Sequence, residues 1–149
     1  MNRRSLLIAA ALSPLASLPV LAADPIIQVA KSATCGCCGA WEDHLRMSGF
    51  SVDSQAIPDE NLWALKARLG LTDDTSSCHT AMIDGYVIEG HVPAADIRRL
   101  LVERPDAVGL TVPGMPIGSP GMEMGDEVEP YDTLLIRQDG STEVFASHS

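Results

Sequence analysis

Short apolar runs alternate with segments of helical periodicity along most of the chain. Ile26–Ala30 is an apolar run typical of a buried strand, and Phe50–Ile57 alternates as a second strand does. Between them, Ala40–Met47 has apolar residues at helical spacing, and Gly49 follows it as a helix end. The pattern therefore predicts a strand, a helix and a strand in this order.

Two more helices and two hairpins follow. Asp59–Leu69 has acidic residues in its first turn and leucines on one face, and Pro93–Arg104 has a similar apolar face. Asp84-Gly85 and Asp139-Gly140 each separate two short apolar runs, which is a strong hairpin signal. Residues 106–130 show neither the helical spacing nor the strand alternation of apolar residues, and are expected to form a long loop rich in Gly, Pro and Met.

This order of elements predicts an α/β fold. We expect a single thioredoxin-like domain with a mixed central sheet flanked by helices, because the β-α-β-α-β-β-α order is typical of such domains. A cysteine-rich turn stands between the first strand and the first helix, where thioredoxin-like domains carry a Cys motif. The length of 149 residues suits one domain.

The first 22 residues are typical of a secretory signal. Two arginines precede an uncharged apolar run that ends in Val20-Leu21-Ala22, a cleavage pattern with the cut after Ala22. The run is short for a membrane anchor and contains two prolines. We therefore expect residues 1–22 to be removed, leaving residues 23–149 as a periplasmic domain without a stable membrane span. Arg3-Arg4 also resembles a twin-arginine signal, so the Sec and twin-arginine routes both stay open.

Charge narrows the range of functions. The chain has 20 acidic and 10 basic residues and a net charge of −10. A nucleic-acid partner is not expected, because such proteins need a basic surface to neutralise phosphates. The apolar fraction of 46% is enough for a packed core and excludes a disordered acidic chain. An acidic exported domain is compatible with the handling of cations.

Four cysteines give the clearest chemical signal. Three lie in the run Cys35-Gly36-Cys37-Cys38, and Cys78 precedes the third expected strand. Cys35 and Cys38 have the spacing of a redox pair, and disulfides within so short a turn would restrain little of the unfolded chain. A thiolate near a helix N-terminus is a nucleophile and a soft metal ligand. Four converging thiolates suit Cu(I) or Zn(II), and nearby thioethers favour copper over zinc.

Histidines and methionines supply further candidates, as secondary metal ligands or as residues that orient a ligand. These candidates are His44, His79, His91, Met115, Met122 and Met124. For each histidine the alternative is an ordinary hydrogen-bonded structural role. For the three methionines the alternatives are a hydrophobic lid and an entry path for copper. We expect Met47 and Met82 in the core and His148 in a frayed C-terminal tail.

Four segments resemble the CopG-type periplasmic copper-resistance family, long known as a domain of unknown function. The segments are Lys31–Trp41, Ser77–Ala81, Gly85–Pro93 and Val112–Glu123. The resemblance implies a thioredoxin-like fold and a role in copper tolerance with redox conversion of copper. It also implies copper held as a multinuclear Cu(I) cluster by thiolates, with the ligands Cys35, Cys37, Cys38 and Cys78. A periplasmic copper exporter or oxidase is the expected class of partner.

One departure from ordinary thioredoxins bears on the choice of function. Cys78-His79-Thr80 stands where those proteins place a cis-proline that guides peptide substrates, which argues against general disulfide exchange. The leading hypothesis is a periplasmic copper-binding protein. The alternatives are a thiol–disulfide oxidoreductase that uses Cys35 and Cys38, and a structural zinc module. Whether the chain is an enzyme stays open.

Overall fold

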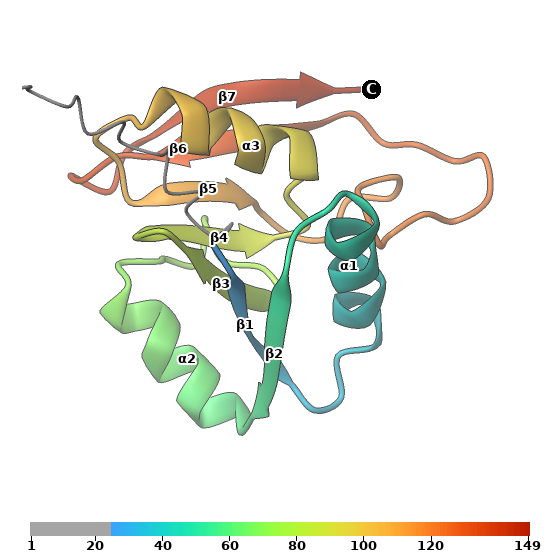
Figure 1. Cartoon of the computed structure of the whole chain (residues 1–149), viewed down its shortest axis with the longest axis horizontal. Helices are drawn as coiled ribbons and strands as arrows, with labels where there is room; N and C mark the ends of the chain where they lie inside the picture. The colour runs from blue at the N-terminus through green and yellow to red at the C-terminus, as the bar shows by residue number, and fades with distance from the viewer. Residues whose placement is uncertain (1–24) are drawn as a thin grey trace, which may run out of the picture.

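The computed structural model describes residues 25–149, which form a seven-stranded sheet with three helices (Figure 1). The expected signal peptide, residues 1–22, and the expected domain start at residue 23 lie outside the described residues. Within residues 25–149, no helix is both long and apolar enough to cross a membrane. The elements in chain order are β1 Ile27–Ser32, α1 Gly36–Met47, β2 Val52–Ile57, α2 Asp59–Arg68, β3 His79–Ile83, β4 Tyr86–Gly90, α3 Ala94–Glu103, β5 Gly109–Val112, β6 Tyr131–Ile136 and β7 Thr142–His148.

The sheet is mixed, as the sequence predicts. Its strand order is β2-β1-β3-β4-β5-β6-β7, with β1 parallel to β2 and β4 parallel to β5. The other neighbours are antiparallel. The expected order of the first seven elements is confirmed, and it is compatible with a thioredoxin-like domain. The pairing sets Lys31 opposite His79 and Thr80 opposite Glu89.

Two helices share one face of the sheet. Trp41 and Leu45 of α1 and Ile97 and Leu100 of α3 are fully buried in one core with residues of β1, β3, β4 and β5. These residues recur at the three- and four-residue spacing that places side chains on one side of a helix. The helix α2 lies on the other side of β1, and Leu62 is buried there (Figure 1).

The expected loop over residues 106–130 contains a strand. β5 is short and buried, and it pairs with β4. A Cβ on Gly109 would lie 1.8 Å from the carbonyl oxygen of Val87, so only glycine permits this close approach of the two strands. Four buried residues that begin with glycine show no alternation, which is why the pattern missed them. The true loop is residues 113–130.

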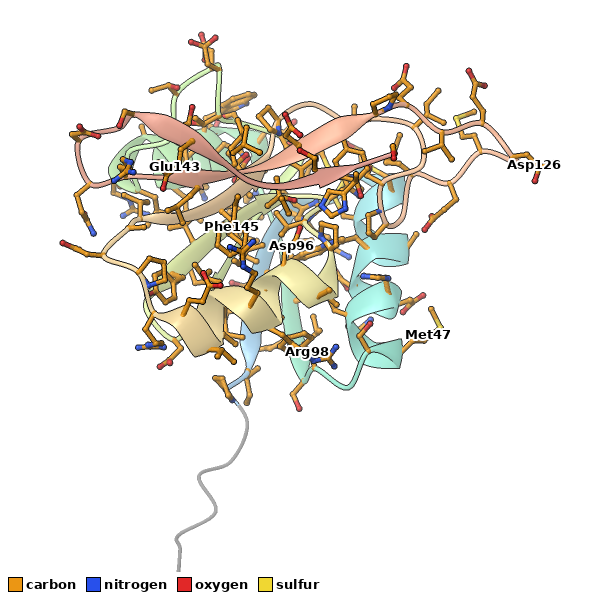
Figure 2. All side chains as sticks on the ribbon, turned by 90° about the horizontal axis from the view of Figure 1, so that it is seen from above. Met47, Asp96, Arg98, Asp126, Glu143 and Phe145 are labelled. Atoms are coloured by element: carbon orange, nitrogen blue, oxygen red, sulfur yellow. A yellow bond between two sulfur atoms is a disulfide. The ribbon has the colours of Figure 1, made fainter. Side chains whose placement is uncertain are left out.

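Met47 and Met82 are not core residues. Met47 is 84% exposed in the last turn of α1 and projects away from the sheet (Figure 2). Met82 is 37% exposed, although Ala81 and Ile83 beside it are buried in the core under α1 and α3. Alternate residues of a strand face opposite sides of the sheet, so Met82 points to the less covered side.

His148 does not lie in a frayed tail, because β7 extends to this residue. Its Nε2 lies 2.9 Å from Oδ2 of Asp96, and its ring stacks on Tyr131 with the centroids 4.7 Å apart. Asp96 projects from α3 toward β6 and β7 (Figure 2), where it also accepts a 2.6 Å hydrogen bond from the hydroxyl of Thr133. The end of the chain is therefore tied to α3.

Candidate metal centre

The cysteine-rich turn lies at the N-terminus of α1. Cys35 is the N-cap residue, and Gly36, Cys37 and Cys38 form the first turn, so the helix begins four residues before the expected start. The N–H of Cys35 donates to the carbonyl of Ser32 at 3.2 Å, which bends the chain out of β1. The unpaired N–H groups of a first helical turn favour a negatively charged ligand.

The four cysteine sulfurs converge at this turn. Cys35 and Cys38 form a disulfide, while Cys37 and Cys78 are free thiols. The Sγ of Cys37 lies 3.7 Å from that of Cys35 and 3.8 Å from that of Cys78. All four Sγ atoms lie within 4.8 Å of one another. The structure thus brings together the four cysteines singled out as ligands, and the group could hold a metal ion.

Two of the candidate histidines meet Cys78. Its Sγ lies 3.1 Å from Nε2 of His91 and 3.2 Å from Nδ1 of His79, and both imidazoles are fully buried. The Nδ1 of His91 lies 2.8 Å from the carbonyl oxygen of Pro120. Because a carbonyl only accepts, Nδ1 of His91 carries the proton and Nε2 presents its lone pair to Cys78.

Burial controls the protonation of these three groups. Desolvation lowers the pKa of His79 to about 3, and the nearby basic groups of His91 and Lys66 lower it further. Desolvation also lowers the pKa of His91, so both imidazoles are neutral at pH 7. Burial raises the pKa of the Cys78 thiol to about 12, and the neighbouring Cys37 raises it further. A metal ion that binds Cys78 must displace the thiol proton, so its affinity rises with pH.

The ring of Trp41 packs against His79 beneath the cysteine cluster. Its ring centroid lies 4.3 Å from that of His79, and its Nε1 donates to the carbonyl of Val92 at 2.9 Å. A Cβ on Gly121 would lie 2.6 Å from the backbone nitrogen of Trp41, so the loop 113–130 packs directly on α1. Among the described residues, Nε2 of His79 has no hydrogen-bond partner.

The three loop methionines lie in different surroundings, and of the three only Met115 contacts a cysteine sulfur. The Sδ of Met115 lies 3.9 Å from Sγ of Cys37, which places this thioether against the cysteine cluster. Met124 is 61% exposed, and its backbone pairs with Glu127. Met122 is half-buried further along the loop, where its backbone bonds Gly118 and Ser119.

His44 lies outside the cluster. Its Nε2 accepts the N–H of Ala94 at 3.1 Å, at the first residue of α3. This bond satisfies one of the N–H groups that a helix start leaves unpaired. Burial lowers the pKa of His44, which keeps the accepting nitrogen free of a proton. The contact matches the structural alternative for this histidine.

A buried ion pair close to Cys78 was not predicted. Lys66 of α2 pairs with Glu89 of β4, and the two side chains are 3% and 0% exposed. Thr80 donates to Oε2 of Glu89 at 2.7 Å and accepts from Nζ of Lys66 at 2.8 Å. Burial raises the pKa of Glu89. The charge of Lys66 and the hydrogen bonds that Glu89 accepts act in the opposite direction and lower it. One signal was available: Lys66 follows Leu62 by four residues, on the buried face of α2.

Residues 75–122 match the family DUF411, described as a protein of unknown function. No curated protein matches the chain significantly. The chain is similar to the solved structure of a copper resistance protein copG in form 2, with 46% identity and a TM-score of 0.80, over 85% of this chain and 100% of that one. Form 1 of copG matches with 48% identity and a TM-score of 0.77, over 84% and 98% of the two chains.

The fold and the sulfur cluster define an α/β protein with a site that could hold a metal ion. With 46% identity to a solved relative whose whole length is aligned with 85% of this chain, the chain belongs to the CopG family of copper resistance proteins. The resemblance of the four sequence segments to this family is confirmed.

The burial of Cys78 leads to a prediction about thiol reactivity. In the metal-free protein with the Cys35–Cys38 disulfide intact, we expect iodoacetamide at pH 8 to label Cys37 at least about tenfold faster than Cys78, because the thiolate is the nucleophile. Labelling of Cys78 should rise only toward pH 12. Mass spectrometry of each labelled peptide against pH measures both rates. Equal rates below pH 10 would contradict the buried environment of Cys78.

Proposed function

We propose that the chain binds Cu(I) through the thiolates of Cys35, Cys37, Cys38 and Cys78 and thereby serves copper tolerance. The observation that carries this proposal is the convergence of four sulfurs within 4.8 Å. The solved relatives are copper resistance proteins, which supports copper as the metal. Soft sulfur donors select Cu(I), and the thioether of Met115 near Cys37 adds one more, which makes zinc the weaker choice.

The nitrogen donors around Cys78 fit a metal site. His91 is a candidate ligand because Pro120 fixes its proton on Nδ1 and leaves Nε2 facing Cys78. His79 is a second candidate through Nδ1, which lies 3.2 Å from Sγ of Cys78, and its low pKa keeps the ring neutral. We leave His44 out of the ligand set, because Ala94 already occupies its accepting nitrogen.

The disulfide sets a condition on this function. Cys35 and Cys38 can bind metal only after two electrons and two protons convert their bond into two thiols. The same couple would allow a copper redox activity, in which two Cu(I) ions give one electron each to the disulfide, two protons are taken up, and two Cu(II) ions and two thiols result. We propose this redox conversion as a second property of the site.

A thiol–disulfide oxidoreductase is the alternative function. One observation favours it, namely that Cys35 and Cys38 are already joined and Cys37 lies 3.7 Å from Cys35. A redox enzyme needs two cysteines, whereas the proposed copper site uses four. Loss of Cys37 therefore separates the two functions.

We expect Cys37→Ser to lower Cu(I) affinity at least about tenfold, since an alcohol replaces a thiolate ligand. The Cys35–Cys38 disulfide should still form. Competition with a chromophoric Cu(I) chelator, under anaerobic reducing conditions, measures the affinity. The control is Thr34→Ser, an exposed residue of the same turn. Unchanged copper affinity in Cys37→Ser would refute the four-thiolate site and favour the oxidoreductase.

The loop methionines should affect copper exchange more than final affinity, because a thioether is a weaker donor than a thiolate. Replacing Met115, Met122 and Met124 together with leucine should retain the copper stoichiometry and slow transfer to a chelator. The geometry assigns this effect to Met115, so Met115→Leu alone should reproduce it and Met124→Leu should not. Stopped-flow transfer measures the rates. A stoichiometry lower by whole ions would make the methionines primary ligands.

We also propose that the mature protein is the domain of residues 23–149 in the periplasm, exported by the Sec or the twin-arginine route. A periplasmic copper exporter or oxidase is the proposed partner. Because cleavage is expected after Ala22, the exported protein should begin at Ala23 or Asp24. N-terminal mass spectrometry of the periplasmic fraction tests this position. An intact Met1 in the membrane fraction would instead support an uncleaved anchor.

A further inference from the structure

The Lys66–Glu89 pair is joined to the segment that carries Cys78. The N–H of Ser77 donates to Oε1 of Glu89 at 2.6 Å, and Lys66 pairs with the same oxygen. Oε2 of Glu89 accepts from Thr80. The carboxylate therefore has partners on both oxygens, and it holds the backbone N–H of Ser77 and the side-chain hydroxyl of Thr80 on either side of Cys78.

Ser77 is held from two more sides. Its hydroxyl donates to the carbonyl of Gly114, the residue before Met115. A Cβ on Gly90 would lie 2.6 Å from the Cβ and Oγ of Ser77, so Ser77 packs directly against the end of β4. Ser77 thus links the Cys78 segment to the start of the loop 113–130.

Stability of the fold does not explain this ion pair. Removing two charges from water costs more than their attraction commonly returns, and apolar pairs of similar volume are often neutral or stabilising replacements. Lys66 and Glu89 are nearly or fully buried, so they bear this cost in full. What an apolar pair would lack is an acceptor for the N–H of Ser77.

We propose that Glu89, held by Lys66, is a positioning residue for the metal ligand Cys78, an inference that rests on the proposed copper site. Through Ser77 the pair fixes the Cys78 segment so that its Sγ stays 3.1 Å from His91 and 3.8 Å from Cys37 before metal arrives. The bond from Ser77 to Gly114 sets the start of the Met115 loop in the same way. A preformed ligand set lowers the ordering cost of binding.

The experiment compares two double variants. Lys66→Met with Glu89→Leu removes the charges and the acceptor, and we expect Cu(I) affinity to fall about 10- to 100-fold, the usual effect of losing a group that orients a ligand. Lys66→Met with Glu89→Gln removes the charges but keeps a side-chain oxygen for Ser77, so it should restore most of the affinity. The control, Arg137→Met with Glu143→Gln, removes a half-exposed ion pair between β7 and the residue that follows β6 and should leave the affinity unchanged.

A metal-free measurement separates this proposal from the copper function. In the reduced protein without copper, the Leu double variant should speed iodoacetamide labelling of Cys78 at pH 8, while the Gln double variant should label as the unaltered protein does. This pattern supports positioning of Cys78 even if no variant binds copper, in which case only the proposed function fails. Circular dichroism and urea unfolding report on folding. If the Leu variant is unfolded, Gly90→Ala, whose Cβ would press on Ser77 and on the carbonyl of Val112, keeps both charges and should give the same labelling change.

Two results would overturn the proposal. One is a folded Leu variant whose copper affinity and Cys78 labelling both match the unaltered protein, because the ion pair would then be purely structural. The other is a folded Gln variant that loses as much affinity as the Leu variant and labels Cys78 as fast, because the acceptor for Ser77 would then have no part in the effect.

Discussion

The antiparallel pairing of β3 with both β1 and β4 determines where the chemistry of this protein lies. Lys31 pairs with His79 and Thr80 with Glu89, so the end of β1, the start of β3 and the end of β4 share one end of the sheet. β5 is parallel to β4 and ends there too. The cysteine turn follows β1, Cys78 precedes β3, His91 follows β4 and the Met115 loop follows β5. Segments distant in sequence thus supply sulfur and nitrogen donors to one place.

The sequence predicts the parts of the site that are contiguous. Cys35-Gly36-Cys37-Cys38 is visible as a run, and the helices α2 and α3 follow from their apolar periods. The contact of His91 with Cys78 depends on strand register and on Pro120, which fixes the proton, and neither can be read from spacing. The strand β5 was missed because four wholly buried residues have no alternation.

His44 and the Lys66–Glu89 pair show that local spacing alone does not give the role of a residue. His44 follows Cys38 by less than two helical turns, yet its accepting nitrogen is occupied by the first N–H of α3. Lys66 and Glu89 were not singled out from the sequence, although they are buried against the Cys78 segment. In both cases the partner comes from another element, so only tertiary packing decides the role.

The site combines groups that are held neutral with one disulfide. Both histidines lack a proton on one ring nitrogen at pH 7, and Cys78 keeps its proton until a metal replaces it. The oxidation state of Cys35 and Cys38 then decides whether two or four thiols are available. Occupancy of the proposed copper site would therefore depend on the redox surroundings as well as on the metal concentration.

The contact of the Trp41 ring with that of His79 has an optical consequence. An indole 4.3 Å from an imidazole emits in an environment that changes when the imidazole gains a ligand or the nearby sulfurs change state. The only other tryptophan, Trp63, is 58% exposed and emits as a solvated indole. With Trp63 replaced by phenylalanine, the fluorescence of Trp41 becomes a built-in reporter of the site that needs no added dye.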